Sequence, residues 1–475
     1  MRSVAFSKHK KNCKPRSMKA ISLYDKSQVN KETLLFDSKA LWKLLIPVMI
    51  EQLLTSFMGM ADSVMVSRVG SAAISAVSLT DSINVLVIQV LAALATGGTI
   101  ICSQYLGRED RKKATEAAKQ VLLTAVAIST LLGVICILLC KPILRLVFGQ
   151  VDAAVMSNSE IYFLITAASF PFLAMFQAGS AFFRAGGNSR FPMIVSVSGN
   201  VLNIAGNALL IFGFHMGVAG AALSTLVARI FIAGFVLISL RKDRQPIVLR
   251  NYFSIRPDWK LIVRVLSIGV PSGIENGMFQ FGKLAIQSSV STLGTAAIAA
   301  QAMTIILENL DGIAGIGIGI GLMTVVGQAM GAGRREEAKY YILKLTWYAE
   351  LVVIASCIII RLLTGPIVWI AGMEAESITM VYFMMNWITI IKPICWTLAF
   401  VPGYGLRAAG DVRFSMTVTT ITMWGCRVAL ATVLIRVFGL GPIAVWIGQM
   451  SDWGLRAFIF SGRFLSGKWL KHEVI

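Results

Sequence analysis

The stretch LLIPVMIEQLLTSFMGMADSVM, residues Leu44 to Met65, is an apolar run long enough to cross a bilayer as a helix, which takes roughly 20 residues. It carries Pro47 near its start and two carboxylates, Glu51 and Asp62. At about 100° per residue, the carboxylates return to within roughly 20° of the same helix face. Because ionisable side chains inside a membrane helix are costly and usually face a cavity or a bundle interior, this face is a candidate functional site. The simpler interpretation is that both carboxylates lie near the helix ends, where water solvates them.

The composition is that of an α-helical membrane protein. Of the 475 residues 56% are hydrophobic and 14% are charged, whereas soluble proteins average about 45–50% and about 25%. The net charge of +20 would suit nucleic-acid binding, but the lysines and arginines stand in short gaps between apolar runs. The seven cysteines form no Cys-x-x-Cys motif and predict neither a zinc site nor a disulfide framework. We therefore expect an all-α polytopic protein whose partners include the lipid bilayer and no nucleic acid.

Twelve apolar runs of about the spanning length follow a basic segment. Residues 1–39 are polar and basic and lack the apolar core of a signal peptide, which predicts a cytoplasmic tail. The runs lie at residues 41–67, 75–104, 118–140, 159–183, 191–213, 217–240, 262–290, 298–328, 341–363, 379–405, 414–436 and 440–464. Basic residues gather in the gaps after every second run. By the positive-inside rule, we expect a multi-pass protein of the plasma (cell inner) membrane with both termini in the cytoplasm.

The two halves of the chain repeat each other. The motif pairs that stand 224 positions apart are Pro47 and Pro271, Glu51 and Glu275, and Gln104-x-x-Gly107 and Gln328-x-x-Gly331. With six runs in each half, both halves enter the membrane in the same direction, as parallel repeats do in carriers whose lobes rock around a central site. The sequence thus predicts an N-lobe at 40–240, a basic linker at 241–261, a C-lobe at 262–464 and a short cytoplasmic tail at 465–475.

A second repeated motif follows the fourth and tenth runs. It reads Arg184-Ala-Gly-Gly-Asn-Ser-Arg190 in the first half and Arg407-Ala-Ala-Gly-Asp-Val-Arg413 in the second. Gly permits a turn after a helix, and Asn or Asp can bond the free amides of the next helix. We interpret the motif as a structural turn inside the cell whose arginines reach the lipid head groups.

With these features the chain resembles the MATE (multidrug and toxic compound extrusion) family over about residues 40 to 464. The resemblance rests on the two six-helix halves, Pro47-x-x-x-Glu51, Asp62-Ser-Val-Met-Val, Gln104-Tyr-Leu-Gly107 and Arg184-Ala-Gly-Gly-Asn188. It implies a V-shaped, two-lobed antiporter that expels cationic, amphipathic organic compounds in exchange for inward-moving H⁺ or Na⁺. The expected partners are therefore small-molecule cations, and we expect a monomer.

Three amides form a polar stripe on the fifth run. Asn200, Asn203 and Asn207 share one helix face, where they could knit helices together or line a site. The resemblance pairs Asp62 with Asn203 and Asn207 as an N-lobe cation site, at which Na⁺ would be the one metal ion. Carbonyl oxygens with one carboxylate suit a hard cation, and a lone buried carboxylate suits a proton. The sequence leaves the coupling ion open. Asp81, which we place at the start of the second helix, is interpreted as a charge that complements the helix dipole.

The second half holds further candidates for the cavity or for a second coupling site. They are Glu275 and Lys283 in the seventh run, Glu308 and Asp311 in the eighth and Lys392 in the tenth, with Glu51 as their counterpart in the first half. Buried charges should pair, and we expect Lys283 or Lys392 to pair with Glu308 or Asp311. The NorM-like branch of the resembled family has carboxylates at two positions that are Phe279 and Trp396 here. This departure counts against a NorM-type cation site in the C-lobe.

Other functions leave no matching pattern. The three histidines lie outside the helix centres and there is no phosphate-binding loop, so we expect neither an enzyme nor a cofactor beyond the coupling H⁺ or Na⁺. A lipid-linked saccharide flippase of the same superfamily would have a strongly cationic cavity, whereas the candidates here are mostly acidic. A membrane-embedded acyltransferase would need a His and Asp cluster, and a channel would need a filter or a ring of like charges.

Overall fold

The computed structural model describes residues 23–25, 27–30, 32–149, 151–243, 245–250, 252, 255–472 and 474–475. These residues form helices, turns and loops and contain no strand. The predicted all-α class is therefore confirmed for this part of the chain. Most of the predicted basic tail, residues 1–22, lies outside the described residues, as do Arg244 and residues 251 and 253–254 of the predicted linker.

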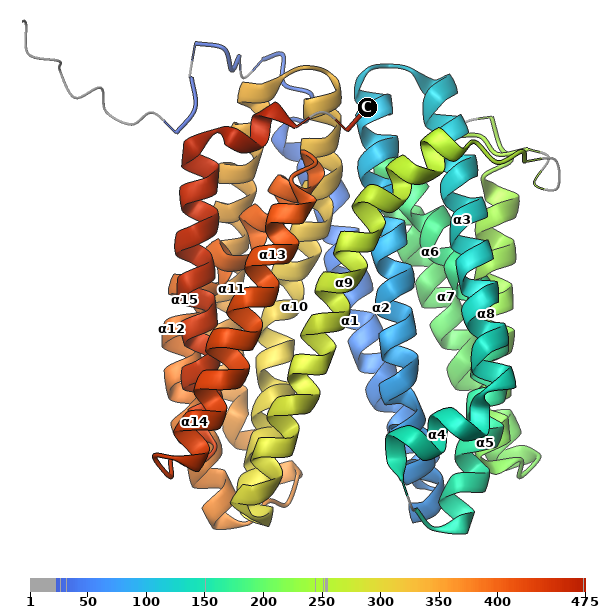
Figure 1. Cartoon of the computed structure of the whole chain (residues 1–475), viewed down its shortest axis with the longest axis vertical. Coiled ribbons are helices and arrows are strands. Elements are labelled where there is room, and N and C mark those ends of the chain that lie inside the picture. The colour runs from blue at the N-terminus through green and yellow to red at the C-terminus, as the bar shows by residue number, and fades with distance from the viewer. Residues whose placement is uncertain are drawn as a thin grey trace, which may run out of the picture.

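The helices divide into two bundles (Figure 1). The first consists of α1 (Ser38–Ser67), α2 (Ser71–Gly107), α3 (Arg111–Leu138), α4 (Cys140–Phe148), α5 (Ala153–Ala168), α6 (Phe170–Ala185), α7 (Arg190–Asn207), the π-helical η1 (Ala208–Gly213) and α8 (Gly217–Ser239). The second consists of α9 (Trp259–Val290), η3 (Ser291–Leu293), α10 (Thr295–Gly331), α11 (Arg335–Ile370), α12 (Ala375–Ala408), α13 (Val412–Thr422), the π-helical η4 (Met423–Leu430), α14 (Ala431–Arg436), α15 (Ile443–Ser466) and η5 (Lys468–Lys471).

The membrane crossings follow the predicted apolar runs. Among the described residues, nine helical segments are long and apolar enough to span a bilayer, and the pair α5 and α6, bent by 43°, is a candidate for a tenth span. The bend falls just before Pro171 at the start of α6, where proline is tolerated because it has no amide to leave unpaired. Helices α9 and α15, of 32 and 24 residues, also run the length of a bundle but carry more polar side chains, including Glu275, Lys283, Asp452 and Arg456. This layout is consistent with twelve crossings in two lobes.

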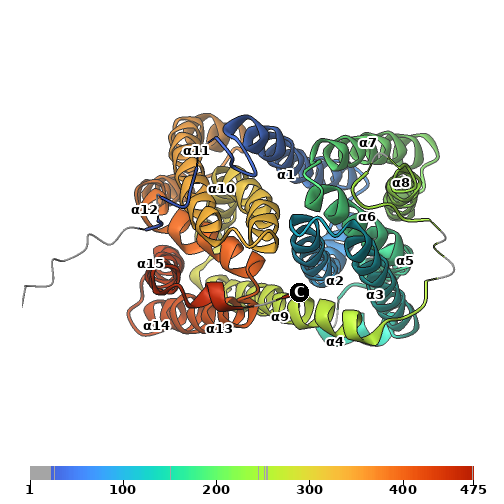
Figure 2. The same cartoon turned by 90° about the horizontal axis from the view of Figure 1, so that it is seen from above.

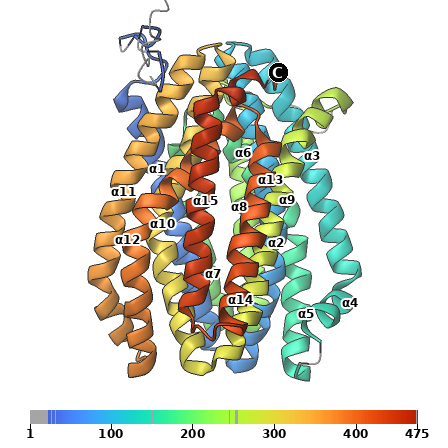
Figure 3. The ribbon, with the colours of Figure 1, turned by 60° about the vertical axis from the view of Figure 1, so that its left-hand side comes forward.

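The bundles meet at one end and diverge toward the other (Figure 1). The closed end carries the α2–α3 turn, the α10–α11 turn and the C-terminus. Viewed from above, the bundles stand side by side (Figure 2), and the oblique view shows that their helices run roughly along the same axis (Figure 3).

Helices α1 and α9 each contribute to both bundles. Near the closed end Leu41 and Leu44 of α1 belong to the core of α10 and α11, while Val66 at the other end of α1 packs with the first bundle. In the same way Val265 of α9 belongs to the core around α2 and α3, while Val290 packs with η4 and α14. The two repeats thus exchange the closed-end halves of their first helices.

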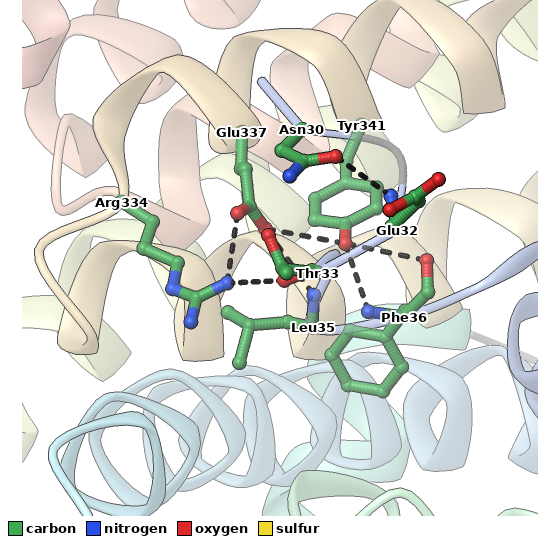
Figure 4. A network of polar contacts seen from close by, with 8 residues as sticks. All are labelled: Asn30, Glu32, Thr33, Leu35, Phe36, Arg334, Glu337 and Tyr341. Carbon is green, nitrogen blue, oxygen red and sulfur yellow. Dashed lines mark hydrogen bonds and ion pairs between the residues drawn. The ribbon is translucent and has the colours of Figure 1, made fainter. Parts of the chain in front are cut away.

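The segment before α1 also lies on the second bundle (Figure 4). Arg334 donates a 2.7 Å hydrogen bond to the carbonyl oxygen of Thr33, and the Leu35 amide donates to the Glu337 carboxylate. The Phe36 amide donates to the Tyr341 hydroxyl at 2.8 Å. These bonds bind the segment across the start of α11. At the other end of the chain, Arg108 of the first bundle donates to the carbonyl oxygen of Ile475 at 3.1 Å.

Candidate functional site

A carboxylate and two amides meet in the first bundle. Asn207 of α7 donates a 2.7 Å hydrogen bond to Asp62 of α1. Both polar atoms of the Asn203 side-chain amide have hydrogen-bond partners when its nitrogen faces the same carboxylate. In this orientation the nitrogen donates to Asp62 at 2.8 Å, and the oxygen accepts from Ser224 and Thr225 of α8. One helical turn separates the two asparagines, so both reach the carboxylate from one face of α7. The structure thus brings together three of the four residues predicted for the cation site.

The fourth predicted residue, Asn200, lies one turn closer to the start of α7. Its side-chain nitrogen is buried and finds no hydrogen-bond partner among the described residues. The hydrogen bonds to Asp62 therefore come from the last two positions of the predicted i, i+3, i+7 face.

A second carboxylate and an arginine lie near Asp62. Asp81 accepts a hydrogen bond from Asn84 at 3.2 Å and interacts electrostatically with Asp62 and with Arg229 of α8. The interpretation of Asp81 as a helix-start charge is wrong, because α2 begins ten residues earlier, at Ser71. Asp81 therefore lies inside the bundle, where its charge adds to that of Asp62.

Sequence reasoning missed Arg229. Its guanidinium donates a 2.6 Å hydrogen bond to the Ser169 hydroxyl and supplies the positive charge that faces both carboxylates. The signal was present, because a single arginine stands in the middle of the apolar run 217–240. Such a charge is by default a functional-site residue in a membrane helix.

In the second bundle, one lysine joins two carboxylates. Lys392 of α12 forms ion pairs with Asp311 and, at 2.8 Å, with Glu308, both on α10. Lys392 and Asp311 are fully buried and Glu308 is nearly so. The predicted pairing of Lys392 with these carboxylates matches the geometry, whereas Lys283 does not join it. A buried charge without its partner is strongly destabilising, so removing any one of these three residues should destabilise the bundle.

Three more charged residues of this bundle were missed. Arg456 of α15 pairs with Asp452 at 2.7 Å, and Arg427 of η4 donates to the Gln449 side chain. All three lie within the predicted apolar runs 414–436 and 440–464. Beside its carboxylates, the cluster inside this bundle therefore holds the buried cations Lys392, Arg427 and Arg456.

Aromatic rings stand where the resembled branch has carboxylates. The Lys283 ammonium lies 4.9 Å from the ring centre of Phe279, and the Lys392 ammonium lies 5.3 Å from the ring centre of Trp396. Such distances are those of cation–π contacts. Each position thus presents an aromatic face to a lysine instead of a negative charge.

The glutamates of the repeated Pro-x-x-x-Glu motif pair with the arginines of the turn motif. Arg184 lies 3.4 Å from Glu51, and Arg407 lies 3.2 Å from Glu275. The four side chains are buried or nearly so. One expectation needs correction: these two arginines turn inward to the glutamates rather than to the lipid head groups. The two pairs are related by the internal repeat.

The repeated Gln-x-x-Gly motifs join the bundles at the closed end. Gln104 donates to the Ala408 carbonyl oxygen at 2.8 Å, and Gln328 donates to that of Ala185 at 2.7 Å. A Cβ atom at Gly107 would lie 2.1 Å from the carbonyl oxygen of Gln328, and one at Gly331 would lie 2.0 Å from that of Gln104. Only glycine permits this approach of α2 and α10. We call these contacts the closed-end seam.

Comparisons with known proteins agree with this architecture. The MatE family model matches residues 47–209 and 271–433, one match in each repeat. Over 444 residues, 92% of this chain and 94% of the relative, the chain is 29% identical to "Probable multidrug resistance protein NorM" of Thermotoga maritima. It is 24% identical to "Multidrug and toxin extrusion protein 2" of Mus musculus, covering 91% of this chain and 75% of that protein. These matches do not favour the flippase alternative.

A solved structure shares the fold. It is described as the "outward-facing conformation of a multidrug resistance MATE family transporter", with a TM-score of 0.84 and 19% identity over 90% of this chain and 96% of that one. The family matches in both repeats confirm the resemblance that the motifs predicted. The chain belongs to the MATE family of multidrug efflux transporters.

Proposed function

We propose that this chain is an antiporter that couples the entry of H⁺ or Na⁺ to the export of cationic, amphipathic drugs and toxic organic compounds. The observation that carries the proposal is the Asp62 cluster, in which one carboxylate inside a membrane bundle is reached by two amides. A carboxylate at such depth is costly unless it serves binding or transport. The printed names of the relatives, which refer to multidrug resistance and toxin extrusion, agree with this substrate class.

The sidedness follows from charge. Arg108, Arg111, Lys112, Arg334 and Arg335 gather at the closed end, which by the positive-inside rule is cytoplasmic. We infer a protein of the plasma membrane with both termini inside and with the bundles diverging outward. The lobes 40–240 and 262–464, joined by the linker 241–261, are proposed as the bodies that rock. We propose that the protein acts as a monomer, without catalysis and without a resident cofactor.

Both coupling ions fit the cluster by different routes. A proton needs only the Asp62 carboxylate, which loses its charge on binding. Na⁺ needs oxygen ligands, and Asn203 and Asn207 would have to turn their amides to provide them, because their nitrogens face the carboxylate. The Asn207 oxygen is buried without a hydrogen-bond partner among the described residues, so it is available for such a turn.

Efflux from proteoliposomes tests the proposal. A fluorescent organic cation is loaded, and a pH gradient and a Na⁺ gradient are imposed separately, for the wild type and for Asp62→Asn. We expect one gradient to drive efflux, which names the ion, and the substitution to abolish it. Ser63→Ala, one residue along the same helix, is the matched control and should transport like the wild type.

Two outcomes would refute parts of the proposal. If neither gradient moves the dye, export of organic cations is rejected. If Asp62→Asn transports at the wild-type rate, the coupling site lies elsewhere, and the triad of Lys392, Glu308 and Asp311 is the next candidate. Size-exclusion profiles of both variants establish that the protein is folded.

A further inference from the structure

Two ion pairs of the second bundle contribute to one small cavity. One pair joins Arg407 to Glu275 at 3.2 Å, and the other joins Arg456 to Asp452 at 2.7 Å. Glu275 and both arginines line the cavity together with Ser415. These four residues come from four helices, α9, α12, α13 and α15. The cavity is therefore a point at which four helices of the bundle meet.

Each of the four lining residues has a buried polar atom without a partner. These atoms are Oε2 of Glu275, Nε of Arg407, Nε of Arg456 and Oγ of Ser415, and none of them has a hydrogen-bond partner among the described residues. Ser415 and Arg456 are only 1% and 2% exposed. Buried polar groups are nearly always hydrogen-bonded, because an unpaired one is costly. Four such atoms around one cavity therefore indicate a polar ligand.

The chemistry of the four atoms selects this ligand. The two Nε atoms can only donate a hydrogen bond, and the ionised Glu275 carboxylate can only accept one. An anion could not donate to Glu275, and a cation would face two guanidinium groups. Water both accepts and donates, and a buried water makes two to four hydrogen bonds. The cavity volume of about 10 Å³ is at the lower end of what a single water requires, about 10–15 Å³.

The first repeat differs at the equivalent positions. There both carboxylate oxygens of Glu51 accept from Arg184, so neither is left for another ligand. The counterparts of the cavity serine and of the α15 arginine, 223 and 224 positions earlier, are Pro192 and Ile232. Neither side chain can bond a water. The four polar atoms are thus a feature of the second repeat, which the first repeat replaces with apolar groups.

We propose that this cavity is a binding site for one water molecule that joins the two ion pairs. The water accepts from the Nε atoms of Arg407 and Arg456, and it donates to Glu275 and Ser415. All four orphaned atoms are then satisfied by one molecule. The inference concerns the scaffold of the second bundle, so it goes beyond the proposed export function and does not depend on the compound transported.

The water would hold α9 at the place where this helix passes from one bundle to the other. Val265 of α9 packs with the first bundle and Val290 packs with the second, and Glu275 lies between them. The network of the two ion pairs and the water ties this middle part of α9 to α12, α13 and α15. It therefore joins the crossing helix to the second bundle through polar contacts as well as through apolar packing.

Hydroxyl-radical footprinting tests the site. The full chain in nanodiscs is exposed to a brief X-ray pulse, which converts a bound water into a radical that oxidises the nearest side chains, and mass spectrometry locates the oxidised residues. Phe460 lines the cavity and is 3% exposed. Phe182, which is 1% exposed in the apolar core of the first bundle, is the matched reference. We expect Phe460 to be oxidised and Phe182 to remain unmodified.

Three variants show whether the oxidation comes from this cavity. Ser415→Val adds apolar volume and should displace the water, so Phe460 should lose its oxidation. Ser415→Ala leaves the space and the other three polar atoms, and it should retain the oxidation. Thr417→Val, at an exposed position of the same helix, is the control and should behave like the wild type.

Two results would overturn the proposal. The first is a wild-type protein in which Phe460 resists oxidation as well as Phe182 does. The second is a folded Ser415→Val protein in which Phe460 is oxidised at the wild-type rate. If Ser415→Val does not fold, the comparison of Phe460 with Phe182 in the wild type decides. No ion gradient or transported compound enters these measurements, so their failure is distinguishable from a failure of the efflux assay.

Discussion

The side-chain amide of Gln104 in the first bundle donates a hydrogen bond to the carbonyl oxygen of Ala408 in the second. Gln328, its counterpart in the second repeat, donates the equivalent bond to the carbonyl oxygen of Ala185 in the first bundle. We expect Gln104→Ala with Gln328→Ala to weaken the closed-end seam by about 1–3 kcal/mol, the net value of two hydrogen bonds. Spin labels at the exposed positions Lys112 and Arg335 should then report a larger population of long distances across the seam. An unchanged distance distribution would show that the two bonds do not hold the bundles together.

Adding a side chain at Gly107 is a second test of the closed-end seam. A methyl group there would meet the Gln328 carbonyl oxygen at 2.1 Å, which is too close for any Cβ contact, so Gly107→Ala should force α2 and α10 apart. We expect the closed end to widen in the same spin-label measurement and export to fall. Gly234→Ala is the control, because a Cβ on that helical glycine of α8 meets nothing within 4 Å. Equal behaviour of the two variants would contradict the role of the close approach.

Removing one partner of the Glu51–Arg184 ion pair should destabilise the protein more than removing both partners. Arg184→Gln leaves a buried carboxylate unpaired, and we expect a loss of about 3–5 kcal/mol in stability. Adding Glu51→Gln should recover part of that loss. Thermal unfolding of the purified protein measures the effect, with exposed Glu116→Gln as a neutral control. A double variant that is no more stable than Arg184→Gln would show that the two residues are not coupled.

For the same reason, Lys392 and Lys283 of the second bundle should differ in their effect on stability. Lys392→Met leaves Glu308 and Asp311 buried without their cation, so it should cost about 3–5 kcal/mol. Lys283→Met removes a cation that has no ion-pair partner among the described residues, and we expect it to leave thermal stability nearly unchanged or raised. If Lys392→Met and Lys283→Met unfold at the same temperature, the difference in ion pairing does not control stability.

The fold was predictable because its main determinants repeat along the sequence. Each predicted run gives one helix or a few consecutive helices, as residues 191–213 become α7 with η1. The constant separation of the Pro-x-x-x-Glu and Gln-x-x-Gly motifs indicated two parallel repeats. The family match begins at Pro47 and again at Pro271, which is the same separation. Hydrophobic length and repeated motifs are local properties, and a single sequence displays them.

Partners across helices were harder to predict. The sequence drew attention to Glu51 and to Arg184 separately, but nothing local indicates that a residue in the first helix bonds to one 133 positions later. No repeated motif contains Arg229, Arg427, Asp452 or Arg456, and each stands inside an apolar run rather than in a gap between runs. The charge balance of each lobe could be assessed only after these residues had been placed.

The exchange of the closed-end halves of α1 and α9 also constrains how the protein is made. Leu41 and Leu44 emerge early during synthesis, yet the core that they join includes Ile318 and Leu345 of the second repeat. The first six crossings therefore enter the membrane with part of α1 lacking its final neighbours, and this part can settle only after α10 and α11 have been inserted. A cut in the linker would leave two fragments that must reassociate before either core is complete.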